Sequence, residues 1–251
     1  MSDVLLLVLL SSISFTAWFT SMLVGGGSSL ILIPLVTLLL GAASVAPVLT
    51  IGSIIGNVQR SVLLWQHIDW KLTLWQLPGV TAGSLVGAYA FTKIRAEGLQ
   101  FFIAIALVYM MVHSLLSHRI QMPAISIRAW HFLPLGFFSA IVSGLVGSTG
   151  PLLNPAYLNY GLEKERMIAT RSAGFTLTHT IKIIAYSVLG VFSPALIGYG
   201  LVVGCAALPA NWLGHKVLEK MSPEQFQVAA VSFVGLSGVW MLWQQRAFFI
   251  H

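Results

Sequence analysis

The sequence has few charged residues and a single cysteine. Only 8% of the 251 residues are Asp, Glu, Lys or Arg, against about 25% in an ordinary soluble domain, whereas 57% are hydrophobic. Cys205 alone excludes an intrachain disulfide and most cysteine-based metal sites. The net charge of +6 comes from scattered Lys and Arg residues, so nucleic acid is not an expected partner. The composition predicts an all-α, polytopic membrane helix bundle with no room for a separate soluble domain.

Carboxylates are missing from the apolar segments. All seven acidic residues lie at a terminus, in a predicted loop or at a helix end, whereas Arg60, Arg171, His179 and Lys182 lie inside predicted spans. An unpaired cation within a membrane costs a few kcal/mol. A bound anion would offset that cost, so the pattern favours an anionic ligand. The acidic residues are Asp3, Asp69, Glu97, Glu163, Glu165, Glu219 and Glu224.

Signatures of enzymes are also missing. The chain has no H-E-x-x-H, no Walker loop, no cysteine pair and no aspartate within a predicted span. A Ser148–His179 dyad is conceivable, but the doubled layout described below argues against it. We therefore expect no catalytic residue, no metal and no cofactor.

Apolar segments fill most of the chain. Two of them, 28–41 and 150–160, are too short to cross a bilayer comfortably, since a span needs about 20 apolar residues. Ten crossings result if both short segments cross, and eight if both are re-entrant; we favour ten. The segments are 4–24, 28–41, 44–65, 72–92, 98–117, 129–146, 150–160, 166–190, 194–218 and 224–245.

Glycines interrupt the chain just before each short segment. Val24–Pro34 reads V-G-G-G-S-S-L-I-L-I-P, and a similar break lies at 147–155. A helix that begins inside the membrane presents unpaired N–H groups and a positive dipole end, which bind anions. The serines and the threonine at the breaks can cap these helices or donate to an oxyanion. The candidates here are Gly25, Gly26, Gly27, Ser28, Ser29, Gly147, Ser148, Thr149 and Gly150.

The two halves of the chain overlay on each other. A shift of 121 places Gly26 and Pro34 on Gly147 and Pro155. A shift of 122 places a second set of residues on their counterparts, namely Gly52 on Gly174, Asn57 on His179 and Arg60 on Lys182. Glycine-bounded short segments at matching places in two halves are typical of transporters with broken helices. We predict two transmembrane repeats, 1–122 and 123–251, which form one membrane domain and are inverted because each has five crossings.

The positive residues set the orientation. With ten crossings, most cations fall on one side, which the positive-inside rule makes cytoplasmic. Both termini are then outside, and eight crossings would nearly remove the bias. The predicted cytoplasmic side carries Lys71, Arg119, Arg128, Lys164, Arg166, Lys216 and Lys220, and the other side carries Lys93, Arg95 and Arg246.

Three stretches resemble the signature regions of the sulfite exporter TauE/SafE family of membrane permeases. They are G-G-G-S-S-L-I-L-I-P from Gly25, G-L-V-G-S-T-G-P-L-L from Gly144, and A-T-R-S from Ala169. The resemblance covers nearly the whole chain. It implies transport of sulfur-containing anions such as sulfite or organosulfonates (sulfoacetate) in a bacterial inner membrane. Ser148, Thr149 and Asn154 depart from the usual second motif, which leaves the substrate open.

The polar side chains inside the spans complete the predicted site. Arg171, Phe175, Thr178, His179 and Lys182 share one helical face. Three of the polar residues inside the spans also have a possible structural role. Arg60 could reach the interface, Arg171 could be a cytoplasmic anchor, and His179 could bond a neighbouring helix. The side-chain candidates for substrate binding are Asn57, Arg60, Asn154, Arg171, His179 and Lys182.

The sequence therefore predicts a secondary transporter for small sulfur-containing anions, an exporter, working by alternating access around a midplane cationic site. The alternatives are a passive anion channel and a non-transporting intramembrane enzyme or assembly factor. The expected partners are the anionic substrate and membrane lipid. Protons or the membrane potential are the candidates for coupling, with His179 as the proton site. A homodimer is the candidate assembly.

Overall fold

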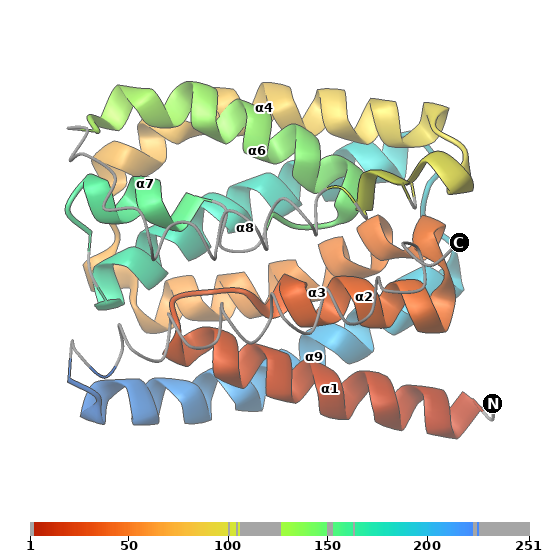
Figure 1. Ribbon diagram of the computed structural model, residues 1–251, viewed down its shortest axis with the longest axis horizontal. Helices are drawn as coiled ribbons and strands as arrows, with labels where there is room; N and C mark the ends of the chain where they lie inside the picture. Colours follow the sequence, from red (N-terminus) through yellow and green to blue (C-terminus); the bar gives the residue numbers. More distant parts are fainter. Residues whose placement is uncertain are drawn as a thin grey trace, which may run out of the picture.

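The computed structural model describes residues 3–99, 101–103, 105, 127–149, 153–162, 164–222 and 225. These residues form helices and turns, with no strand among them. The long helices lie side by side along the longest axis of the molecule (Figure 1). The prediction of an all-α membrane bundle is confirmed.

The helix bounds follow the predicted segments closely, with one exception. The described part of the predicted segment 150–160 contains the six-residue helix α7, which begins one residue before Pro155. The predicted segments 98–117 and 224–245 lie mostly outside the described residues. The elements of the first half are α1 (Asp3–Leu23), α2 (Ser28–Leu40), α3 (Ala42–Leu63), the 3-10 turn η1 (Trp65–His67) and α4 (Trp70–Lys93). Those of the second half are the 3-10 turn η2 (Ala129–His131), α6 (Phe132–Val146), α7 (Asn154–Asn159), α8 (Lys164–Val188) and α9 (Pro194–Lys220).

Four of the described helices are long and apolar enough to cross a membrane. They are α1, α3, the combined stretch Ala129–Val146 and α9. The apolar helix α2 has 13 residues, or about 20 Å, which is shorter than a hydrocarbon core of about 30 Å. The chain is therefore a multi-pass membrane protein with at least one short helix inside the bundle.

The helices of the bundle run in two opposite directions. In Figure 1, α1 and α3 run from right to left, whereas α6 and α8 run from left to right. The first turns of α4 and α8 and the last turn of α9 all lie at the left end of the bundle. These turns carry Lys71, Lys164, Arg166 and Lys220, four of the cations assigned to one side by the sequence.

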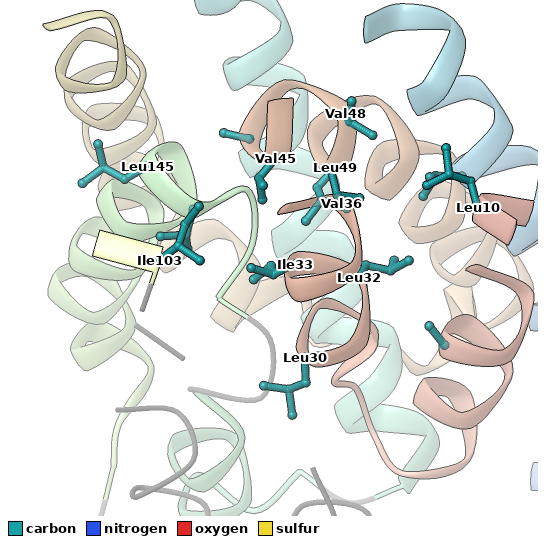
Figure 2. Packing of buried hydrophobic residues seen from close by; sticks show 14 of the residues in the cluster. Leu10, Leu30, Leu32, Ile33, Val36, Val45, Val48, Leu49, Ile103 and Leu145 are labelled. Atoms are coloured by element: carbon teal, nitrogen blue, oxygen red, sulfur yellow. The ribbon is translucent and has the colours of Figure 1, made fainter. Parts of the chain in front are cut away.

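The short helix α2 lies in the middle of a hydrophobic core (Figure 2). Its residues Leu30, Ile33 and Val36 are 3%, 0% and 0% exposed. The same cluster contains Leu49 of α3 and Leu145 of α6, so side chains from both halves enclose α2. The glycine break at the start of α2 is thereby held inside the protein.

Glycines of α4 bring its backbone close to α6. Gly79, Gly83 and Gly87 are spaced by four residues and face α6, as in small-residue helix pairs of membrane proteins. A Cβ added at Gly83 would lie 2.2 Å from the carbonyl oxygen of Phe137, and one at Gly79 would lie 2.0 Å from that of Leu133. Neither contact can be relieved by turning a side chain, because the obstacle is backbone.

We expect Gly83→Ala to lower the free energy of unfolding by about 1–3 kcal/mol, the usual cost of an overpacked interface. Thermal unfolding of the purified protein in detergent measures the change. The matched control is Gly198→Ala on α9, where an added Cβ would meet nothing within 4 Å. Equal melting temperatures for the two variants would contradict close packing of α4 on α6.

Candidate functional site

The first break is built from glycines in a left-handed conformation. Gly25, Gly26 and Gly27 have φ of 71°, 127° and 111°, a region that residues with a Cβ rarely adopt. The Gly26 amide bonds the carbonyl oxygen of Ser21 at 2.8 Å, which closes α1, and α2 begins at Ser28. The predicted helix break is confirmed, and the three glycines are its local cause.

The guanidinium of Arg171 lies directly on this break. Its Nη1 donates a hydrogen bond to the carbonyl oxygen of Gly25, and a Cβ added at Gly26 would lie 1.3 Å from Nη1. The side-chain amide of Asn154 donates to the same carbonyl oxygen at 3.5 Å. Arg171 is 7% exposed, so its alternative role as a cytoplasmic anchor is wrong. Residues from α7 and α8 therefore converge on the gap between α1 and α2.

The start of α2 offers a buried hydroxyl. Gly27 is the N-cap of α2 and no side chain caps this end, so of the two alternatives for the serines here, capping is not observed and donation to an oxyanion stays a prediction. Ser29, the second helical residue, is 4% exposed, and its Oγ has no hydrogen-bond partner in the described part of the chain. Two features of an anion site, a helix N-terminus and a free hydroxyl donor, thus lie beside the glycines that contact Arg171.

The second break is held by Lys182. Gly147 has φ of 93° and ends α6. Lys182 is 0% exposed, and its Nζ donates to the carbonyl oxygens of Ser143 and Gly147 at 2.7 and 2.8 Å and to Oγ of Ser143 at 3.2 Å. The Tyr186 hydroxyl donates to the carbonyl oxygen of Gly144. Two side chains of α8 thereby donate hydrogen bonds to the backbone carbonyl groups at the end of α6. Lys182 uses all three of its ammonium protons in this way or on the Ser143 hydroxyl.

The hydroxyl residues after Gly147 are buried. Ser148 and Thr149 are 8% and 0% exposed, and the hydroxyls of Thr149 and Ser139 lie 2.9 Å apart. Gly150 lies outside the described residues. Since α7 has only six residues, its first turn is not equivalent to the start of the 13-residue helix α2.

Arg60 lies in a three-helix network beside the first break. Its Nε donates to Oδ1 of Asn211 at 2.7 Å, Nη1 to Oγ of Ser21 at 3.1 Å, and Nη2 to the carbonyl oxygen of Trp18 at 2.8 Å. At 3% exposed, Arg60 does not reach the membrane interface, so that alternative is wrong. Its guanidinium joins α3, α9 and the last turns of α1. The neighbouring Asn57 donates to the Ser53 carbonyl oxygen of its own helix at 2.8 Å.

The two cations that correspond in the sequence overlay make corresponding contacts. Arg60 bonds Ser21 near the end of α1, and Lys182 bonds Ser143 near the end of α6. Both pairs are related by the same shift of 122 residues. In both places a buried cation of one helix donates a hydrogen bond to a serine near the end of another helix.

One face of α8 connects the two breaks. Arg171 lies over the Phe175 ring at 5.0 Å, the Phe175 and His179 rings are 6.1 Å apart, and Lys182 follows one turn later. The predicted shared face is confirmed for these residues. His179 is 0% exposed, and neither ring nitrogen has a hydrogen-bond partner in the described part of the chain. Its alternative role as a donor to a neighbouring helix has no support there.

Gln76 and Tyr157 were missed by the sequence reasoning. Gln76 of α4 is 4% exposed and accepts a hydrogen bond from the Tyr157 hydroxyl at 3.3 Å. Its amide lies against Gly174, where an added Cβ would lie 2.6 Å from Oε1. The signal for Gln76 was available, because an amide inside the apolar stretch 72–92 needs a partner.

The fold and the buried cations define a class of protein: a polytopic helical membrane protein with broken helices and a cationic interior, the architecture of a transporter. The chain belongs to the sulfite exporter TauE/SafE family, whose model matches residues 10–241. The recognised family is thus confirmed, and with it a membrane transporter family for sulfur-containing anions. No curated protein and no solved structure matches the chain.

We expect Gly26→Ala to displace the Arg171 guanidinium and to weaken anion binding at least about tenfold, since its Cβ would occupy the position of Nη1. Thermal-shift titration with sulfite measures the binding. The matched control is Gly41→Ala, which introduces a Cβ at a similarly positive φ of 83° but meets nothing within 4 Å. If both variants bind sulfite equally weakly, backbone strain and not Arg171 explains the loss.

Proposed function

We propose that this protein is a secondary transporter, an exporter, of small sulfur-containing anions such as sulfite or organosulfonates, including sulfoacetate. It works by alternating access around the site between the two breaks. Membership of the TauE/SafE family supports the substrate class. The interior supports an anion and not a metal cation, because the described polar groups beside the breaks are cations, hydroxyls and amides.

The observation that carries the proposal is the position of Arg171 on the first break. An oxyanion placed there would meet the guanidinium, the first amides of α2 and the unpartnered Ser29 hydroxyl. The absence of a Cβ at Gly26 is what lets the guanidinium lie against the backbone at this place. Asn154 would orient the anion from α7. The partnerless buried hydroxyl is then satisfied by the ligand.

Opposite helix directions in the two halves support alternating access. The repeats 1–122 and 123–251 would be inverted, as the opposite courses of α1 and α6 and of α3 and α8 suggest (Figure 1). Rocking of one half against the other would open the site to either side of the membrane in turn.

The cellular setting follows from the same family and charges. We place the protein in a bacterial inner membrane, surrounded by lipid, with the end that carries Lys71, Lys164 and Arg166 in the cytoplasm. Protons or the membrane potential would drive export. A homodimer is the assembly we propose.

Flux measurements separate a carrier from its rivals. Proteoliposomes should show saturable uptake of sulfite or sulfoacetate and accelerated exchange when unlabelled anion is present on the far side. Ohmic single-channel currents would indicate a passive anion channel instead of a carrier. Absence of flux for sulfite, sulfoacetate and sulfate would favour a non-transporting enzyme or assembly factor.

We expect Arg171→Gln to weaken sulfite binding by about 10- to 100-fold, the value of a hydrogen bond to a charged group. Isothermal titration of the purified protein measures the affinity. Lys93→Gln is the control, since it removes an exposed cation from the last turn of α4, where Lys93 lies over the Tyr89 ring. Unchanged affinity in the Arg171 variant would remove Arg171 from the anion site.

A further inference from the structure

Three buried nitrogen-containing side chains of α8 differ in their hydrogen-bond partners. Arg171 is bonded to the first break and Lys182 is bonded to the second, whereas His179 between them has two nitrogens without a partner in the described part of the chain. A rise of about 1.5 Å per residue places His179 about 12 Å from Arg171 along the helix and about 4.5 Å from Lys182. The imidazole therefore lies in the interval between the two breaks.

An imidazole at this place is costly unless something bonds it. Buried polar groups in proteins are nearly always paired, and an exception calls for a ligand, a water or an ion. His179 is fully buried, and its described ring contact is with the aromatic ring of Phe175, which offers no hydrogen bond in the plane of the imidazole. A transported molecule that passes between the breaks is the natural partner.

The hydrogen-bonding chemistry of the face points to a particular kind of partner. Arginine and lysine can only donate, whereas a neutral imidazole has one N–H donor and one bare nitrogen that accepts. The Tyr186 hydroxyl is already used on the Gly144 carbonyl, and the Thr178 hydroxyl on the Gly174 carbonyl at 2.9 Å. Both hydroxyls have given up their proton and have only lone pairs left, whereas His179 has a donor and an acceptor that are both without a partner in the described part of the chain.

We propose that His179, in its neutral form, contacts the transported anion directly and selects an oxoanion that still carries a proton, such as hydrogen sulfite. The N–H donates to an anion oxygen, and the bare nitrogen accepts the proton of the anion. Lys182 and Tyr186 are positioning residues that hold the end of α6. The inference deepens the proposed function and depends on it.

Its chemistry predicts a specific order of affinities. Near neutral pH, sulfite exchanges with its singly protonated form, whereas sulfate carries no proton. Methanesulfonate has the same single negative charge as hydrogen sulfite but no proton to offer. The wild-type protein should bind sulfite at least about tenfold more tightly than methanesulfonate, the difference expected when a buried acceptor is left unpaired.

The test compares three variants by isothermal titration of purified protein with sulfite, methanesulfonate and sulfate at pH 7. His179→Leu removes both nitrogens, so sulfite affinity should fall about tenfold or more, to the level of methanesulfonate. His179→Asn restores one donor and one acceptor and matches Asn57 of the first half, so it should recover most of the preference. Thr180→Val, on the exposed face of the same helix, is the control and should behave as wild type.

Several outcomes would overturn the inference. Equal affinity of the wild type for sulfite and methanesulfonate would show that the protein does not recognise the proton of hydrogen sulfite. This outcome can be observed even if the leucine variant fails to fold. A His179→Leu protein that keeps the sulfite preference would show that a buried water or nothing at all bonds the imidazole. In both cases saturable flux in wild-type proteoliposomes leaves the proposed function standing. If the wild type shows neither binding nor flux of sulfite, the proposed function and this inference are both contradicted.

Discussion

Backbone polar groups in a membrane interior must be satisfied inside the protein, and this constraint shapes the structure at both breaks. Where glycines end α1 and α6, carbonyl groups lose their helical partners. Buried cations supply them: Arg171 at Gly25, and Lys182 at Ser143 and Gly147. The opposite need arises at the start of α2, where N–H groups are left over and attract negative charge. One physical requirement thus explains both the cations in the interior and the place for an anion.

Helix α8 links the two breaks. Its buried face contacts the glycines of the first half through Arg171 and the end of α6 through Lys182 and Tyr186. A movement of α8 would therefore act on both breaks at once. Arg60 performs the matching task in the other half through Ser21 and Trp18, so each half fixes the end of its own first helix.

Much of the fold could be predicted from the sequence, because long apolar segments in a chain with few charges admit little besides a helix bundle. The break at Gly25 and the start of α2 at Ser28 followed from residue types alone. The length of α7 did not, since glycine and proline mark an interruption without saying where the next helix begins and ends. Arg60 shows the other limit: its position near a helix end suggested the interface, whereas Asn211, 151 residues away, holds it inside.

The sequence by itself determined the membrane class, the family, the two breaks and the identity of the buried cations, since these depend on composition and local spacing. The tertiary structure decided which cation serves which break. Arg171 could have pointed to the cytoplasm, and Lys182 could have been free for a ligand. Long-range packing of α8 against both halves committed each of them to a carbonyl group, and it left His179 between them without a partner among the described residues. Hydrogen-bond partners that are far apart in the chain depend on how the helices pack, and a local sequence pattern does not predict that packing.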